Sequence, residues 1–177
     1  MTIFNRMSDY STGNSRVYEK ESQIYNEIIQ QIEKIFGLLE NKIDSDDILD
    51  YVFELNGEKF SLKSLKDYIQ MKRKIILRNN DGDIQRLISE LNNYYEIMKY
   101  KIKDKLLQNK EYDDIQECLY KINGLIYSNL IYEPLKKYTS SNIIEKKWTL
   151  EELEKLKNDI YNRKVSIQQY LSKLPKR

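Results

Sequence analysis

Apolar residues recur three or four positions apart through most of this sequence, which is the spacing of an amphipathic α-helix. The first such segment runs from about Arg16 to Ile43, and its polar residues fall on the other side of the helix. Its apolar stripe consists of Tyr25, Ile28, Ile32, Phe36, Leu39 and Ile43. Residues 1–15 are polar and rich in turn-forming residues, so we predict an N-terminal arm there and a helix after it.

A different pattern, strict alternation of apolar and polar residues, flanks the dipeptide Asn56-Gly57. Asn-Gly favours a tight two-residue turn, so the alternation predicts a small β-hairpin at about 51–62. The turn sets the register, in which the opposed pairs are Leu55 with Glu58, Glu54 with Lys59, Phe53 with Phe60 and Tyr51 with Leu62. Because a two-stranded ribbon is marginally stable in water, its apolar face must rest on a helix or extend the sheet of another chain.

Two further helices follow the hairpin. Ser61 is placed to cap the start of the first, where Phe60 and Leu65 can form a hydrophobic staple. The polar stretch NNDGD at residues 79–83 ends that helix and begins the next. This third helix has a long apolar stripe made of Ile84, Leu87, Ile88, Leu91, Tyr94, Tyr95, Met98, Ile102 and Leu106.

The last two helices each begin at a capping pattern. Asp113 with Gln116 predicts a capping box for the fourth helix, whose stripe is Ile115, Cys118, Leu119, Ile122 and Ile126. Thr149 with Glu152 predicts another box at the start of the final helix, whose apolar residues form a narrow, coiled-coil-like seam. The seam residues, our leading candidates for contact with another protein chain, are Leu153, Leu156, Ile160, Lys164, Ile167, Leu171 and Leu174.

Together these elements predict a mainly α fold, a bundle of about five helices with one small β-hairpin at about 51–62. A chain of 177 residues suits one domain, and no repeat or linker divides it, so residues 16–177 are predicted to form a single helical domain after the arm of residues 1–15. The sequence has neither a secretory pattern nor a run of about 18 apolar residues, so we expect neither export nor a membrane span.

The residue types present limit the chemistry of this chain. It contains no histidine and one cysteine, Cys118, so a zinc site and a nucleophile–histidine pair lack their usual residues within one chain. The glycine-rich motifs that bind phosphates are missing as well. Cys118 lies on an apolar stripe, which favours a small buried side chain over a reactive thiol. We therefore expect no enzymatic activity, no cofactor and no metal.

Carboxylates gather at residues 44–50, 81–83 and 113–114. Mg²⁺ or Ca²⁺ would accept such oxygens. These clusters also lie where helices are predicted to begin, where a carboxylate accepts unpaired main-chain N–H groups, and we favour this capping role. Glu145 and Lys147 have the E-x-K spacing of some metal-dependent nucleases, but the flanking strands of those enzymes are missing.

Charge is strongly segregated along the chain, although the net charge is only +2. Residues 17–58 contain 11 acidic and 3 basic side chains, whereas residues 59–78 contain 7 basic and 1 acidic. One face of the second predicted helix carries Lys63, Lys66, Arg73, Lys74 and Arg78. Such a face suits the phosphates of nucleic acid. The alternative, which we favour, is that it faces water or pairs with the acidic first helix, within one subunit or between two.

The composition indicates an AT-rich genome, such as that of a virus or a low-GC bacterium, because the chain has 23 Ile, 15 Asn and 15 Tyr but no Ala. Several tyrosines fit the apolar stripes poorly. They are either interface residues or a result of codon bias with partial exposure. These tyrosines are Tyr100, Tyr112, Tyr127, Tyr132, Tyr138, Tyr161 and Tyr170.

These observations favour a non-enzymatic helical protein that acts by protein–protein contact. It would be an oligomer or a component of a larger assembly, of the kind that a virus or mobile element encodes. Its partner would be a second copy of itself or another protein chain. The rival hypotheses are a nucleic-acid-binding protein that uses the basic helix face at 63–78, and a small inhibitor of a host protein. A single cysteine fits a reducing compartment, so we expect the cytoplasm or a virion as its location.

Overall fold

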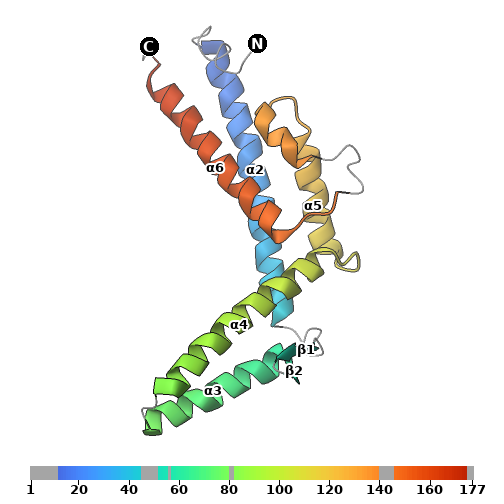
Figure 1. The fold of residues 1–177 in the computed structure, drawn as a ribbon. Coiled ribbons are helices and arrows are strands. Elements are labelled where there is room, and N and C mark those ends of the chain that lie inside the picture. Colours follow the sequence, from blue (N-terminus) through green and yellow to red (C-terminus); the bar gives the residue numbers. More distant parts are fainter. Residues whose placement is uncertain (1–11, 45–51, 56, 80–81, 140–145, 175–177) are drawn as a thin grey trace. The chain divides into compact units, whose positions relative to one another are not determined.

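The computed structural model describes residues 12–44, 52–55, 57–79, 82–139 and 146–174. These residues are mainly helical, and the helices are joined to one antiparallel hairpin (Figure 1). The elements are α2 (Thr12–Ile43), β1 (Val52–Leu55), β2 (Glu58–Ser61), α3 (Leu62–Asn79), α4 (Gly82–Leu107), α5 (Asp113–Ile126), the 3-10 helix η2 (Glu133–Tyr138) and α6 (Leu150–Ser172). The predicted helical bundle with a small hairpin is confirmed as the fold class.

The chain divides into two compact units. Unit 1 comprises residues 1–37 and 107–177, and unit 2 comprises residues 38–106. The boundary falls within α2 and at the end of α4. The prediction of a single domain over residues 16–177 therefore stays a prediction, and each unit is described by itself.

Helix α2 begins earlier than the sequence predicted. Residues 12–15 of the expected polar arm belong to its first turn, and residues 1–11 lie outside the described part of the chain. Its apolar stripe also differs at one position, because Ile35 is fully buried whereas Phe36 is half-buried. Adjacent residues of a helix point about 100° apart, so a small rotation of the helix decides which of the two enters the core.

Of the two capping boxes predicted from the sequence, the one at the start of α6 is present and the one at the start of α5 is not. The box of α6 is confirmed: the Glu152 N–H donates to Thr149 Oγ1 at 3.1 Å, and the Thr149 N–H donates to Glu152 Oε1 at 3.3 Å. The box of α5 was wrong, because Tyr112 is the N-cap residue and its side chain makes no capping hydrogen bond. Gln116 instead donates its amide to the main-chain oxygens of Leu107 and Asn109, each at 3.1 Å.

The core of unit 1 contains the full predicted stripe of α5, since Ile115, Cys118, Leu119, Ile122 and Ile126 are all buried. Burial raises the pKa of the Cys118 thiol above its ordinary value. A raised pKa leaves little thiolate at neutral pH, in line with a packing role.

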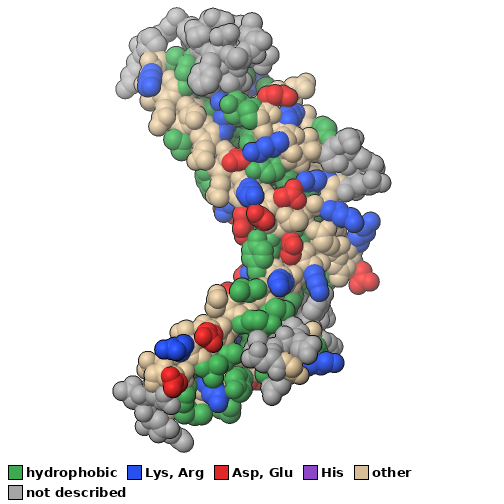
Figure 2. All heavy atoms as spheres, viewed as in Figure 1, with side chains coloured by type: hydrophobic (Ala, Val, Ile, Leu, Met, Phe, Trp, Pro, Cys, Tyr) green, Lys and Arg blue, Asp and Glu red, His purple; other side chains and the backbone are tan. Residues whose placement is uncertain are grey.

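On the face of the molecule in view, Figure 2 shows charges of both signs interspersed with apolar side chains.

Unit 2 contains the hairpin, and its predicted register is confirmed for the described pairs. Tyr51, predicted to oppose Leu62, lies outside the described residues. Opposed residues are Phe53 with Phe60, Glu54 with Lys59 and Leu55 with Glu58. Gly57 has a φ of 83°, a conformation that glycine adopts without strain. Phe60 packs on the buried cluster of Leu65, Ile69, Ile88 and Leu91, so the hairpin rests on helix α3. Ser61 caps α3 as predicted, because its Oγ accepts the Ser64 N–H at 3.1 Å.

Glu40 joins α2 to α4 within unit 2. Its carboxylate contacts Lys103 and lies 3.1 Å from Lys99 Nζ. The hydrogen bond from Lys103, together with the one from Lys99, lowers the pKa of Glu40 below its ordinary value of 4.5.

We predict that Glu40→Gln destabilises the protein at neutral pH but not in acid. A carboxyl whose pKa is lower in the folded state stabilises that state above pH 4.5, and this contribution disappears as the pH falls through the folded-state pKa. Because Glu40 is partly exposed, the difference at pH 7 should be about 1 kcal/mol or less. Urea unfolding at several pH values measures it. Glu90→Gln, at an exposed position of α4, is the control; a difference for Glu40→Gln that persists unchanged at pH 3 would contradict the prediction.

Candidate functional site

A buried ion pair joins α2 to α6 in unit 1. Glu21 and Arg163 are only 2% and 7% exposed. Arg163 donates from Nε to Glu21 Oε2 at 2.8 Å and from Nη2 to Oε1 at 3.2 Å. The Tyr25 hydroxyl also donates to Glu21, and the Tyr132 N–H donates to the Tyr25 hydroxyl at 3.0 Å. Both charges are thus hydrogen-bonded, the condition under which proteins tolerate buried charges.

Aromatic rings enclose the guanidinium group of Arg163. Its central carbon lies 4.1 Å from the ring centroid of Tyr132 and 5.9 Å from that of Tyr18. Burial by itself would lower the pKa of Arg163, but the bonds to Glu21 outweigh burial and raise this pKa. Burial and the bond to Glu21 likewise raise the pKa of Tyr25. Arg163 therefore stays charged and Tyr25 stays protonated over the physiological pH range.

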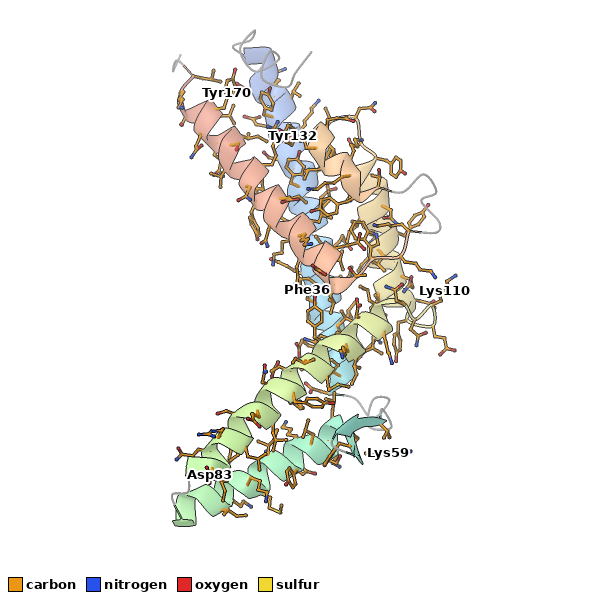
Figure 3. The ribbon with its side chains drawn as sticks, viewed as in Figure 1. Phe36, Lys59, Asp83, Lys110, Tyr132 and Tyr170 are labelled. Carbon is orange, nitrogen blue, oxygen red and sulfur yellow. The ribbon has the colours of Figure 1, made fainter. Side chains whose placement is uncertain are left out.

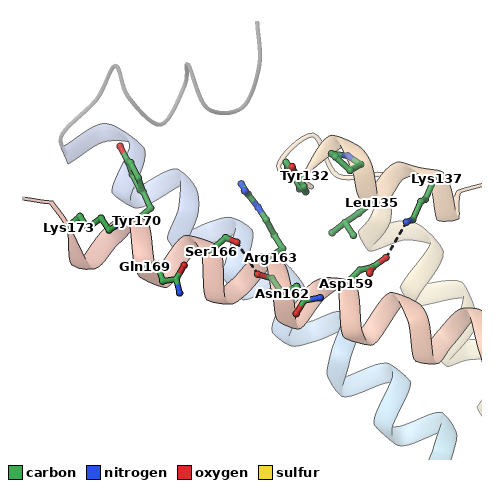
Figure 4. Close-up of a pocket in the computed structure, with 11 residues that line it drawn as sticks. Tyr132, Leu135, Lys137, Asp159, Asn162, Arg163, Ser166, Gln169, Tyr170 and Lys173 are labelled. Atoms are coloured by element: carbon green, nitrogen blue, oxygen red, sulfur yellow. Dashed lines mark hydrogen bonds and ion pairs between the residues drawn. The ribbon is translucent and has the colours of Figure 1, made fainter.

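Beside this ion pair, a groove of about 640 Å³ follows α6 (Figure 4). We call it the α6 groove. One side is formed by Asp159, Asn162, Arg163, Ser166, Gln169, Tyr170 and Lys173 of α6, and the other by Tyr132, Pro134, Leu135 and Lys137 in and before η2. Positions 159–173 span about 21 Å along a helix. The space is therefore long, and its volume lies in the range of ordinary ligand sites.

The side of the groove formed by η2 is held firmly. Tyr138 donates its hydroxyl to Asp159 Oδ2 at 2.5 Å and stacks on the buried Trp148, with 6.4 Å between ring centroids. Burial and the bond to Asp159 raise the pKa of Tyr138, so it stays protonated and continues to donate. Lys137 lies 3.3 Å from the same carboxylate. The carboxylate of the groove is thus already engaged by two side chains.

The two amide side chains of the groove are available to a ligand. Asn162 and Gln169 are exposed, and their amides form no hydrogen bond within the described part of the chain. Lys173 is exposed at one end. Tyr132 and Tyr170, both among the tyrosines singled out from the sequence, are half-buried at the groove (Figure 3). The arrangement is suited to binding through hydrogen bonds and aromatic contact.

The seam predicted on the last helix lies mostly inside the chain. Leu153, Leu156, Ile160 and Ile167 are buried in the core of unit 1, whereas Leu171 and Leu174 are half-buried. Lys164 contacts Asn26 Oδ1 on α2 at 2.5 Å. The four buried residues already have their apolar partners in this chain, and the groove residues lie on another side of α6.

The basic face predicted on α3 is present. Lys63, Lys66 and Lys74 are exposed, and none of them forms an ion pair within the described ranges. Arg73 is exposed and donates to Asn92 Oδ1 at 3.4 Å. Arg78 is in α3, but its side chain lies outside the described part.

Of the predicted acidic clusters, Asp113 and Asp114 lie in the first turn of α5. Residues 45–50 and Asp81 lie outside the described residues, as does Glu145. In the ranges that are described, no three potential metal-ligating side chains come together.

Arg163 and Glu21 were not among the residues predicted from the sequence. Ile160 and Ile167 of the seam are seven positions apart, so either Arg163 or Lys164 can fill the position between them by spacing, and we assigned Lys164. Glu21 precedes Tyr25 by four residues on the apolar side of α2. The sequence did contain a signal for this ion pair. An acidic residue on one helix and a basic residue on another each occupy a position of the apolar stripe, which is the pattern expected of a buried ion pair.

We predict that Leu156→Asp with Ile160→Asp unfolds unit 1. Each change places an unpaired charge in the core, at a cost of about 3 kcal/mol or more. Thermal unfolding followed by circular dichroism measures the loss. Tyr161→Asp with Val165→Asp, at exposed positions of the same helix, is the matched control. A folded double variant that only changes its oligomeric mass would show instead that the seam joins two chains.

We also predict a strong coupling between Glu21 and Arg163. Glu21→Leu or Arg163→Met leaves one charge buried without its partner and should lower the free energy of unfolding by about 3–5 kcal/mol. The double variant should lose much less than the sum, because both charges are gone. Lys155→Met, which breaks an exposed pair with Glu151, should cost about 1 kcal/mol or less. Denaturant unfolding checks all four; additive single effects would contradict the coupling.

No helix in the described ranges is long and apolar enough to cross a membrane. Comparison with protein-family models, with curated proteins and with solved structures finds no match.

Proposed function

We propose that this chain is a non-enzymatic helical protein that works by protein–protein contact, as an oligomer or as a component of a larger assembly. The observation that carries the proposal is the α6 groove, with its length, its aromatic side and its free amide groups. Tyrosine is enriched at protein interfaces, and Tyr132 and Tyr170 both line this groove. A contact surface on the last helix also agrees with the sequence, although it uses another face of that helix than the apolar seam.

The dimensions of the groove favour an extended segment of another protein chain. Asn162 and Gln169 are seven residues apart on α6, which corresponds to a rise of about 10 Å. Three residues of extended chain cover the same length at about 3.3 Å each. An amide side chain both donates and accepts, so the two amides suit the main-chain N–H and C=O groups of such a segment. The full groove accommodates about six extended residues.

The side chains at the groove indicate what the segment carries. Leu135 is buried, and the ring of Tyr132 is held against Arg163 beside it, so an apolar side chain of the partner fits this part. Lys173 is exposed and forms no ion pair in the described part of the chain, which favours an acidic residue at that end. The sides of the groove are held by internal bonds before a ligand arrives, and this preorganisation lowers the entropic cost of binding.

The setting that we propose is a reducing compartment, either the cytoplasm or a virion assembled in it. Cys118 suits this setting, because it is a buried thiol of the core. The AT-rich composition supports a virus or another mobile element as the source of the gene.

We predict that peptides selected on this protein from a displayed random library depend on the two groove amides. Asn162→Ala with Gln169→Ala should weaken their binding about 30-fold, since two hydrogen bonds of about 1 kcal/mol each are lost. The matched control is Asn158→Ala with Gln168→Ala, which removes the same two residue types from exposed positions of α6 outside the groove. Fluorescence anisotropy measures the affinities.

The enriched peptides should share an apolar residue and an acidic residue a few positions apart. Peptides that bind the groove variant and the unaltered protein equally well would overturn the proposal. Light scattering of the same proteins then identifies the source of the segment: a multimer that the groove variant dissolves shows that the segment belongs to a second copy.

A further inference from the structure

A row of lysines on helix α3 lies outside the function proposed for the groove. Lys63, Lys66 and Lys74, which we call the α3 lysine row, are all exposed. At 100° per residue they fall within about a quarter of the helix circumference, and they span about 16 Å along the axis. The opposite face of α3 carries Leu62, Leu65 and Ile69, which are buried in the core of unit 2. The packing of that apolar face therefore fixes the row on the solvent side.

The three lysines of the α3 lysine row form no ion pair among the described residues. Lysines such as Lys99, Lys146 and Lys157 each contact a carboxylate. Asp67 lies on the same face of α3 as the row but forms no ion pair in the described part. Like charges three or four residues apart destabilise a helix. A bound polyanion would relieve this repulsion.

The charge of the row suits a phosphate backbone better than a protein surface. Protein interfaces are depleted in lysine. Lysine is a flexible point charge, which suits a ligand whose charges repeat along its length. A nucleic-acid duplex carries one charge per about 1.7 Å of axis, so a row of about 16 Å always meets several phosphates whatever the register.

We propose that the α3 lysine row binds the sugar–phosphate backbone of duplex nucleic acid without reading its sequence. Lys59, on strand β2 before α3, is exposed as well (Figure 3). The exposed face between Lys66 and Lys74 carries Asp67 and Gln70, and no aromatic side chain. Base stacking, on which single-strand binding depends, is thus not provided by this face. The proposal is independent of the α6 groove, which lies in the other unit.

The test is a salt titration with the full chain and a labelled DNA duplex, followed by fluorescence anisotropy. Replacing Lys63, Lys66 and Lys74 with Gln should reduce the slope of log affinity against log salt by about one per lysine, about three in all. The matched control replaces Lys20, Lys34 and Lys110 with Gln. These lysines are also exposed and free of ion pairs in the described ranges, so both variants have the same net charge. The control should keep the original slope.

A change of opposite sign gives an independent check. Asp67→Asn removes the one acid of this face and should tighten binding to the same duplex severalfold, with the largest gain at low salt. Equal loss of slope in both lysine variants would overturn the proposal, because net charge alone would then explain binding. So would equal affinity for the duplex, for poly-glutamate and for vesicles of anionic lipid, since the surface would then recognise negative charge of any source.

Discussion

Two opposite charges withdrawn from water determine how unit 1 is assembled. Glu21 and Arg163 are 142 residues apart in the chain, and each would be strongly unfavourable in the core without the other. Their bidentate contact therefore aligns α2 with α6 at one definite position along both helices. The bond from Tyr25 to Glu21, and the bond from the Tyr132 main chain to Tyr25, extend this alignment to the segment before η2. Apolar packing alone tolerates small shifts between two helices, so it would fix the alignment of α2 with α6 less tightly.

The α6 groove follows from this arrangement. Arg163 lies at its base with its charge already balanced, and Tyr132 stands against the guanidinium as part of the facing side. Helix α6 consequently serves three purposes on three sides. Its apolar seam fills the core, Lys157 and Lys164 contact Glu33 and Asn26 of α2, and a further side lines the groove. The most regular pattern of α6 is thus internal, whereas the side that lines the groove is irregular in sequence.

Unit 2 shows a simpler division of roles. The apolar side of α3 closes a core with α4 and supports the hairpin through Phe60, so the basic side is left to the solvent. Segregation of charge along the sequence becomes segregation of charge on a surface only because the core fixes the rotation of the helix. Within unit 2 the lysine row forms no ion pair among the described residues, which leaves its charge available.

Much of the local structure could be predicted from the sequence, because it depends on neighbours in the chain. The Asn56-Gly57 turn determined the hairpin register, Thr149 and Glu152 determined the start of α6, and the spacing of apolar residues identified the five buried positions of α5. Only the tertiary structure decided that Asp113 and Gln116 do not form a capping box. The Gln116 amide donates instead to main-chain oxygens of residues that precede α5. The tertiary structure also decided that Arg163, and not Lys164, fills the gap in the seam. Periodicity tells which side of a helix is apolar, but the pairing of Glu21 with Arg163, and the groove built on it, require distant segments to meet in space.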